Sequence, residues 1–364
     1  MAEFRVVRSG ILLILLGQLV SLANTAASVF SKVLVDQGIQ VPTGQTFFFY
    51  FTLALAVSIV RSLQRRNWCS VGSVSAELRA DIPLWPFWVA AFFDIGGNFA
   101  MLLALRFTAL TSVLLLGTGG ILPFVLLLGS WFSRHCYRPA HIRAVLLSLL
   151  GYALIVLADE SSPADLVAGA SPVLGDILCA LSAFFFACSS ISQEALLSRG
   201  ATPGLLLARM QSAAAMMAGL LLLAVGLPEL RELWRLVTSP LGSGAPFFGF
   251  TLALVAMYTL APILIGRGSA ALYNVSLLTT NVYGTVWAVV REGEQISVLK
   301  AAGSAAVLLG LVLFTWAGDP GVGNSREIMA LHAAPGTSSD VDSTVTPATG
   351  DFFSAKSFEI SSAR

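Results

Sequence analysis

Charged side chains are scarce in this sequence. Asp, Glu, Lys and Arg make up only 11% of its 364 residues, whereas hydrophobic residues make up 56%. Mean hydropathy is +0.81, which is far above the value of an ordinary soluble domain. The net charge of +1 gives no sign of nucleic-acid binding. The composition therefore excludes a soluble globular domain and indicates an integral membrane protein.

Signatures of metal, disulfide and protease chemistry are also lacking. The four cysteines, Cys69, Cys136, Cys179 and Cys188, are widely spaced and show no metal-ligand or paired-loop pattern. The zinc motif H-E-x-x-H is absent. A membrane aspartyl protease needs two facing acids at depth, and only Asp94 lies deep in an apolar run. We therefore expect no catalytic residue, no metal and no cofactor.

Ten apolar runs are long enough to cross a bilayer as helices, at about 1.5 Å per residue and a hydrocarbon core of roughly 30 Å. The sequence therefore predicts an all-α membrane protein with the lipid bilayer as its surroundings. The first run is expected to insert without cleavage. The predicted spans are residues 10–35, 43–63, 84–107, 110–132, 141–158, 173–197, 204–225, 246–266, 269–290 and 296–317.

The spans divide into two sets of five. A stretch that contains Pro and Ser follows the fifth span, and the fifth and tenth spans both hold a Gly in a Leu-rich run, at Gly151 and Gly310. Because five is odd, the second set is inverted, and inverted repeats are typical of secondary transporters. We predict an N-terminal segment at 1–9, a first five-helix repeat at 10–158, a loop at 159–172, a second repeat at 173–317 and a disordered tail at 318–364.

The distribution of Lys and Arg predicts the orientation. An even number of spans places both termini on the same side of the membrane. The N-terminal segment and the loops after the second, fourth, sixth and eighth spans hold twice as many Lys and Arg residues as the opposite loops. We therefore predict a multi-pass protein with both termini in the cytosol, and the choice between plasma membrane and endomembrane stays open.

Polar side chains interrupt the ninth predicted span. Asn274, Asn281 and Thr285 fall on one face of a continuous helix, where a lipid-facing helix would carry apolar residues. Thr279 and Thr280 lie on another face. Because both faces cannot line one cavity, we favour Asn274 and Asn281 as solute-binding residues and keep Thr279 and Thr280 as further candidates.

Asp94 is the only acid deep in a span, where a carboxylate costs roughly 2.5 to 3.5 kcal/mol on insertion scales. Asn98 lies one helical turn further on, on the same face. Together they can bind hydrogen-bonding groups of a solute, or Asp94 can carry a proton as the coupling ion. The alternative is a structural hydrogen bond between helices.

Other polar residues in the spans are candidates of the same kind. Each of them can line a solute-binding site or can hold two helices together by a hydrogen bond. These residues are Gln18, Asn24, Thr25, Gln45, Tyr50 and Tyr258. Gln193 and Glu194, near the end of the sixth span, are candidates for a cytosolic gate. The cluster of Gly117, Gly119 and Gly120 is expected to bend span four or to pack it closely.

An ordered set of motifs resembles the F branch of solute carrier family 35, within the drug/metabolite transporter superfamily. The motifs are GQLVSL (17–22), PTGQTFFFY (42–50), FDIGGNF (93–99), ALTSV (109–113), LGDIL (174–178), SSISQE (189–194) and YNVSLLTTNVY (273–283). The resemblance implies the drug/metabolite transporter fold of two inverted five-helix repeats, and alternating-access transport of a small organic solute. The resemblance also supports carrying six residues over as positions that match the family's motifs. They are Asp94, Asn98, Gln193, Glu194, Asn274 and Thr279.

The sequence departs from this family in span four. Leu114 and Gly117 stand where the family usually has Gln and Asp, so span nine is expected to carry more of the recognition. The resemblance implies a nucleobase-, nucleoside- or vitamin-like solute. Nucleotide sugars remain an alternative, although no basic cluster lies deep in the spans to hold a diphosphate. A non-transporting receptor or scaffold is another alternative, and a homodimer is left open.

Overall fold

The computed structural model is helical, and its described residues contain no strand. It describes residues 2–39, 41–67, 82–104, 107, 113–132, 135, 137–160, 172–238, 244–292 and 297–318. The tail from residue 319 onward and residues 161–171 of the predicted inter-repeat loop lie outside the described residues, as do Cys69 and Cys136.

The helices follow the two predicted halves of the chain. The first half contains α1 (Ala2–Asp36), α2 (Pro42–Asn67), α4 (Trp85–Ala104), the π-helical η1 (Val113–Thr118), α6 (Ile121–Trp131) and α7 (Pro139–Glu160). The second half contains α8 (Pro172–Ser198), α9 (Pro203–Val225), the 3-10 turn η2 (Leu227–Glu229), α10 (Leu230–Thr238), α11 (Ala245–Arg267), α12 (Ala270–Leu278), α13 (Thr280–Trp287), the π-helical η3 (Ala288–Glu292) and α14 (Val298–Trp316).

Seven of the described helices are long and apolar enough to cross a membrane, and they are α1, α2, α7, α8, α9, α11 and α14. Large apolar side chains face outward from them, and Leu220 and Leu252 are 67% and 71% exposed. Such a surface is favourable in lipid and costly in water. The structure therefore confirms an all-helical, multi-pass membrane protein. The other three predicted spans correspond to α4, to η1 with α6, and to α12, α13 and η3.

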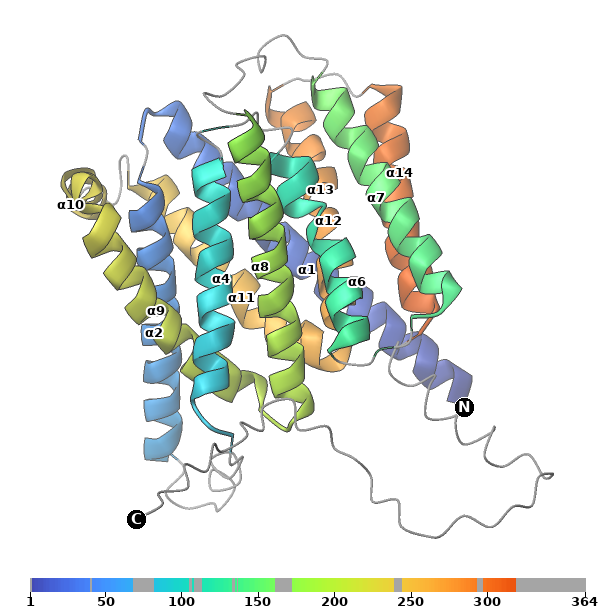
Figure 1. Ribbon diagram of the computed structural model, residues 1–364, viewed down its shortest axis with the longest axis horizontal. Helices are drawn as coiled ribbons and strands as arrows, with labels where there is room; N and C mark the ends of the chain where they lie inside the picture. Colours follow the sequence, from blue (N-terminus) through green and yellow to red (C-terminus); the bar gives the residue numbers. More distant parts are fainter. Residues whose placement is uncertain are drawn as a thin grey trace, which may run out of the picture.

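Some element boundaries differ from the predictions. Helix α1 already begins at Ala2 instead of residue 10, and α7 continues to Glu160. A helix satisfies its own backbone hydrogen bonds, so it can extend beyond the apolar run that the prediction followed. The short helix α10 was not predicted. Its Leu233 and Leu236 are buried against the bundle, and Figure 1 shows α10 at the upper left.

Two predicted spans are interrupted helices. The fourth breaks at Gly119 and Gly120, between η1 and α6, as the glycine cluster predicted. The ninth was predicted to be continuous, and this was wrong, because it divides at Thr279. The Thr279 N–H and Oγ1 both donate to the carbonyl oxygen of Ser276, at 3.0 and 2.7 Å, which tightens the turn. Asn274 and Thr285 therefore lie on two successive helices, α12 and α13.

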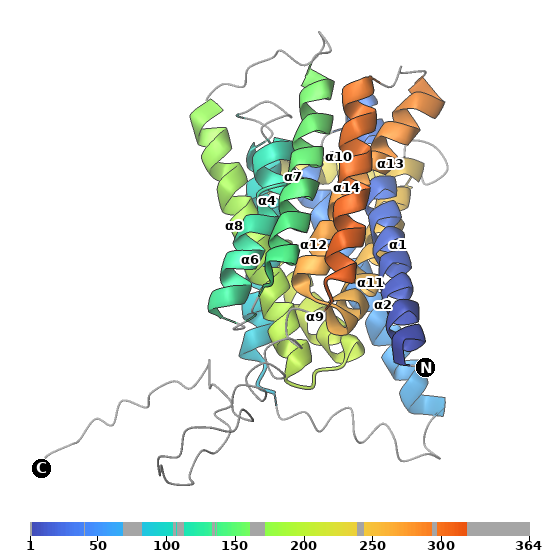
Figure 2. The same cartoon turned by 90° about the vertical axis from the view of Figure 1, so that its right-hand side faces the viewer.

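Helices of the two halves pack against each other in pairs. The most extensive contacts join α7 to α14, α4 to α8, α1 to α11 and α2 to α9. Helices α7 and α14 lie side by side in both Figure 1 and Figure 2. Small residues allow this approach, since a Cβ atom added to Gly151 would lie 2.6 Å from the carbonyl oxygen of Gly303.

Candidate functional site

Asp94 lies in the middle of α4 and is only 4% exposed. Its carboxylate accepts hydrogen bonds from Tyr50 of α2, from Tyr258 of α11 at 3.2 Å and from Ser189 of α8 at 3.3 Å. Four helices therefore meet at one buried acid. We call this set of residues, together with Asn98, the Asp94 cluster.

Asn98 extends the cluster by one helical turn. Its Nδ2 donates to the hydroxyl oxygen of Tyr50 at 2.9 Å and to the backbone carbonyl of Asp94 at 3.0 Å. Because an amide nitrogen carries two protons, both are used, and the Oδ1 atom is the part of Asn98 left to accept a bond. Asn98 and Tyr258 are half-buried, whereas Asp94 is buried. The cluster therefore offers a solute its amide oxygen and phenol more readily than its carboxylate.

Two glycines bring α8 close to Asp94. A Cβ atom on Gly96 would lie 2.7 Å from the ring of Phe185, and one on Gly97 would lie 3.0 Å from the ring of Phe186. The Ser182 hydroxyl also donates to the carbonyl oxygen of Gly97 at 2.8 Å. The absence of side chains at these two positions lets α8 present its polar face to α4.

Gln193 belongs to this polar face of α8. Its Nε2 donates to the Ser189 hydroxyl at 3.2 Å, one helical turn away, and Gln193 is buried. The structure therefore groups Gln193 with the Asp94 cluster. Its predicted partner in a gate, Glu194, points to different elements.

A second polar cluster joins α1 to the break between α12 and α13. Thr279 Oγ1 lies 2.8 Å from the Ser21 hydroxyl oxygen, and the hydroxyls of Ser21 and Thr280 lie 3.1 Å apart. Asn24 Nδ2 donates to Thr280 Oγ1 at 3.2 Å, and Thr25 Oγ1 donates to the Thr280 carbonyl at 3.2 Å. We call these five residues the Thr279 cluster.

Gln18 lies one turn before the Thr279 cluster on α1. Its Oε1 accepts a hydrogen bond from the Tyr283 hydroxyl of α13 at 2.7 Å. Its Nε2 is buried and has no hydrogen-bond partner among the described residues. A buried donor without an acceptor costs about 1 to 3 kcal/mol. This amide therefore marks a place where a ligand could supply the acceptor.

Asn274 and Asn281 are separated by the break at Thr279 and have different surroundings. Asn274 is buried, and its Nδ2 donates to the Ala270 carbonyl at 2.8 Å and to Ser190 of α8 at 3.3 Å. Asn281 is half-buried and lies within hydrogen-bonding reach of Tyr152 on α7. The structure therefore places Asn274 between α12 and α8, and Asn281 beside α7.

Gln45 lies near the start of α2, five residues before Tyr50. It follows Gly44, whose N–H donates to Glu229 Oε2 at 3.0 Å, while the Thr43 hydroxyl donates to the other oxygen of Glu229. Gln45 is therefore at the α10 end of the bundle, and it is not among the residues that bond Asp94 or Tyr50.

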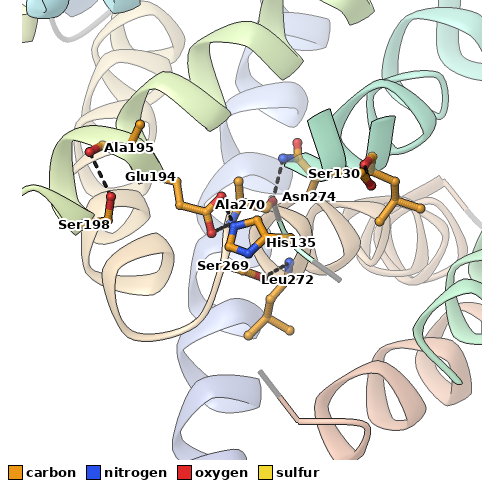
Figure 3. A network of polar contacts seen from close by, with 10 residues as sticks. Ser130, His135, Glu194, Ala195, Ser198, Ser269, Ala270, Leu272 and Asn274 are labelled. Carbon is orange, nitrogen blue, oxygen red and sulfur yellow. Dashed lines mark hydrogen bonds and ion pairs between the residues drawn. The ribbon is translucent and has the colours of Figure 1, made fainter. Parts of the chain in front are cut away.

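Glu194 lies near the end of α8 and contacts two other connections of the chain. Its Oε1 accepts a hydrogen bond from the Ala270 N–H at 3.3 Å, and its Oε2 lies 3.3 Å from His135 Nε2 (Figure 3). Sequence reasoning missed His135, because a single histidine in a loop has no distinguishing pattern. In the described part of the chain, no group of three His, Cys, Asp or Glu side chains could hold a metal ion.

Comparisons with known proteins agree with this architecture. A family model named SLC35F and described as solute carrier family 35 matches residues 7–316. A protein named solute carrier family 35 member F2 from Mus musculus is 25% identical over 315 residues, which cover 83% of this chain and 77% of that protein.

A Schizosaccharomyces pombe protein named an uncharacterized solute carrier family 35 member is 28% identical over 301 residues. That match covers 82% of this chain and 56% of the yeast protein. A solved structure described only as a crystal structure of protein has a TM-score of 0.58 at 20% identity, covering 86% of this chain and 96% of its own. This last similarity shows a shared fold.

Proposed function

This chain belongs to solute carrier family 35, and we propose that it is a secondary transporter that moves a small organic solute across a membrane by alternating access. The observation that carries the proposal is the Asp94 cluster. It joins α2 and α4 of the first half to α8 and α11 of the second half through one buried acid. Polar groups at this depth are costly, and in transporters they lie at the interface of the repeats.

We also propose that ten helices cross the membrane. Helix α4 has 20 residues, which is about 30 Å at 1.5 Å per residue. The other two additional spans are the interrupted helices formed by η1 with α6 and by α12, α13 and η3. An interrupted helix is tolerated in a membrane where the break is buried in protein, and Thr279 is fully buried.

The packing supports two inverted five-helix halves. In the proposed equivalence, α1, α2, α4, η1–α6 and α7 correspond in order to α8, α9, α11, α12–α13 and α14. This exchange turns the α4–α8 contact into the α11–α1 contact and maps the α2–α9 and α7–α14 contacts onto themselves. Figure 1 shows α1 starting at the lower end and α8 at the upper end.

The α7–α14 interface supports the same equivalence at the level of residues. A Cβ atom on Gly151 would lie 2.6 Å from the carbonyl oxygen of Gly303, and one on Gly310 would lie 2.8 Å from that of Ala144. Gly151 follows Ala144 by seven positions, as Gly310 follows Gly303 (151 − 144 = 310 − 303 = 7). Corresponding positions of the two halves therefore make corresponding contacts.

We propose that the end of the bundle with the α6–α7, α8–α9 and α11–α12 connections faces the cytosol. These connections and the N-terminal segment belong to the set that carries the excess of Lys and Arg. Both termini then lie in the cytosol.

The hydrogen-bonding groups favour an uncharged solute that both donates and accepts. Asn98 offers an acceptor, and Gln18 offers a buried donor without a partner in the described structure. In the described part of the chain, the hydrogen bonds of the Asp94 and Thr279 clusters involve no Lys or Arg, the side chains that a nucleotide-sugar diphosphate would favour. A nucleobase-, nucleoside- or vitamin-like solute therefore fits better, and Asp94 is the acid that would carry a coupling proton.

A thermal-stability screen of the purified protein tests the proposal. Nucleobases, nucleosides, vitamins and nucleotide sugars are added singly, since a ligand that binds the folded state raises the unfolding temperature by mass action. We expect a nucleobase, a nucleoside or a vitamin to raise the unfolding temperature of the natural protein and not that of Asn98→Leu. Stabilisation by nucleotide sugars alone would overturn the substrate class. Binding without exchange across a membrane would favour a receptor or scaffold.

A further inference from the structure

The contact around Glu194 joins three separate connections of the chain at the end of the bundle proposed to face the cytosol. His135 follows α6, Glu194 lies near the end of α8, and Ala270 is the first residue of α12. The side chains of His135 and Glu194 are only 17% and 12% exposed. Figure 3 shows the Glu194 carboxylate facing both the His135 imidazole and Ala270.

The Glu194 carboxylate is well matched to the start of α12. The first N–H groups of a helix have no partner within the helix, and they carry a partial positive charge. Ser269 satisfies the N–H of Leu272 at 3.1 Å, and Glu194 satisfies that of Ala270 at 3.3 Å. The second carboxylate oxygen lies 3.3 Å from His135 Nε2, close enough to attract the imidazole when it is protonated. One side chain therefore connects both halves of the chain.

The polar residues one turn inside this contact are buried. Ser190 lies one turn before Glu194 on α8, bonds Asn274 of α12 at 3.3 Å and is 4% exposed. A cavity of about 730 Å³ lies against the contact, and His135, Glu194 and Gly268 are among its lining residues. The cavity also extends along α4 and α8 to Val89, Phe93 and Phe184, so Asp94 and the residues that bond it lie beside this cavity without lining it.

We propose that His135, Glu194 and Ala270 form a gate that closes this end of the protein, and that Glu194 must release both partners before the end opens. This inference rests on the proposed transport function. Alternating access requires the helices at one end to separate while those at the other end close. Glu194 is thus a gating residue, and His135 is a positioning residue that holds its carboxylate toward α12.

A reporter cysteine tests the gate without knowledge of the solute. Ser190→Cys places a thiol one turn inside Glu194, in a chain whose four natural cysteines are replaced by alanine. The probe is a charged, membrane-impermeant maleimide added to the cytosolic side of vesicles. We expect slow labelling with the gate intact and about tenfold faster labelling with Glu194→Ala, a change that corresponds to about 1.4 kcal/mol.

Graded variants separate the two contacts of Glu194. Glu194→Gln keeps an oxygen for the Ala270 N–H and loses the charge that attracts His135. The labelling rate of the reporter cysteine in this variant should therefore lie between the rates of the parent and of Glu194→Ala. His135→Gln and His135→Ala should resemble Glu194→Gln. Size-exclusion profiles and unfolding temperatures identify any variant that is faster only because it has unfolded.

The control is a carboxylate at the opposite end of the bundle. The Glu229 carboxylate bonds the Thr43 hydroxyl and the Gly44 N–H. It therefore contacts the start of α2, as the Glu194 carboxylate contacts the start of α12. Glu229→Ala should leave labelling of the reporter unchanged. The gate is wrong if Glu194→Ala and His135→Ala label as slowly as the parent, or if Glu229→Ala accelerates labelling equally. Faster labelling without exchange of any solute would reject the transport function and keep the gate.

Discussion

The two polar clusters inside the bundle are built in different ways. The Asp94 cluster has an acid at its centre, and three hydroxyl groups from three other helices donate to it. The Thr279 cluster contains only neutral hydroxyls and an amide, and it lies at a helix break next to Gln18, whose Nε2 donor has no partner among the described residues. A charge in a membrane needs a full set of partners, whereas neutral groups can exchange theirs. The Asp94 cluster therefore holds its four helices together, whereas the hydrogen bonds of the Thr279 cluster can exchange partners.

Removing the acid should have the largest effect on stability. Asp94→Leu leaves the hydroxyls of Tyr50, Tyr258 and Ser189 without their common acceptor. A buried unsatisfied group costs about 1 to 3 kcal/mol, so we expect the free energy of unfolding to fall by about 2 to 4 kcal/mol. Denaturant unfolding in detergent measures it. Asp94→Asn, which keeps one acceptor oxygen, should lose less, and equal losses for the two variants would contradict the assignment.

The two tyrosines of the Asp94 cluster should differ. Tyr50 is fully buried, donates to Asp94 and accepts from Asn98, whereas Tyr258 is half-buried and lies 3.2 Å from Asp94. Tyr50→Phe should therefore cost about 1 to 2 kcal/mol of unfolding free energy, and Tyr258→Phe about half as much. The same unfolding assay gives both values. The reverse order would show that Tyr50 is not the central donor.

The Thr279 cluster should contribute less to stability. Thr279→Val keeps the shape of the side chain and removes its bond to Ser21, and interhelical bonds in membranes average about 0.6 kcal/mol. We expect a loss of about 0.5 to 1 kcal/mol in the unfolding assay. Thr259→Val is the matched control, because Thr259 is exposed and bonds only its own helix. A loss above that of Tyr50→Phe would remove the distinction between the clusters.

Gln18→Leu should change stability least. The variant loses the bond from Tyr283, but it also removes the buried Nε2 donor that has no partner in the described structure. Replacing an unsatisfied group by an apolar one can be nearly neutral, so the free energy of unfolding should stay within about 0.5 kcal/mol. Stabilisation by added solute should nevertheless disappear. A variant that is still stabilised as much as the natural protein would exclude Gln18 from the site.

Local patterns predicted the helices and singled out Asp94 as an acid deep in a span, and the structure buries it. Hydropathy and length indicate spans directly, and a single acid in an apolar run stands out in any sequence. Its partners could not be identified in this way, because Tyr50 and Ser189 lie 44 and 95 positions from Asp94 and approach it only through packing. Tyr50 was a candidate among others, and Ser189 was not distinguished from other small residues.

The break at Thr279 shows where sequence reasoning fails. Thr279 has no Gly or Pro directly before or after it to mark the break, whereas glycines marked the break before α6. The Thr279 hydroxyl contacts the carbonyl of Ser276 and the hydroxyl of Ser21, and the Thr279 N–H bonds the Ser276 carbonyl, three residues back, at 3.0 Å. Asn274 and Asn281 therefore lie on separate helices and contact different neighbours, Ser190 of α8 and Tyr152 of α7.

Counterflow in proteoliposomes tests transport most directly. Vesicles preloaded with the solute selected by the thermal screen receive a radiolabelled trace of it outside. The natural protein and Thr259→Val should both show saturable accumulation, and Asn98→Leu should be slower by about tenfold or more, a loss of about 1.4 kcal/mol in recognition. Saturable binding with no accumulation by the natural protein would contradict the account.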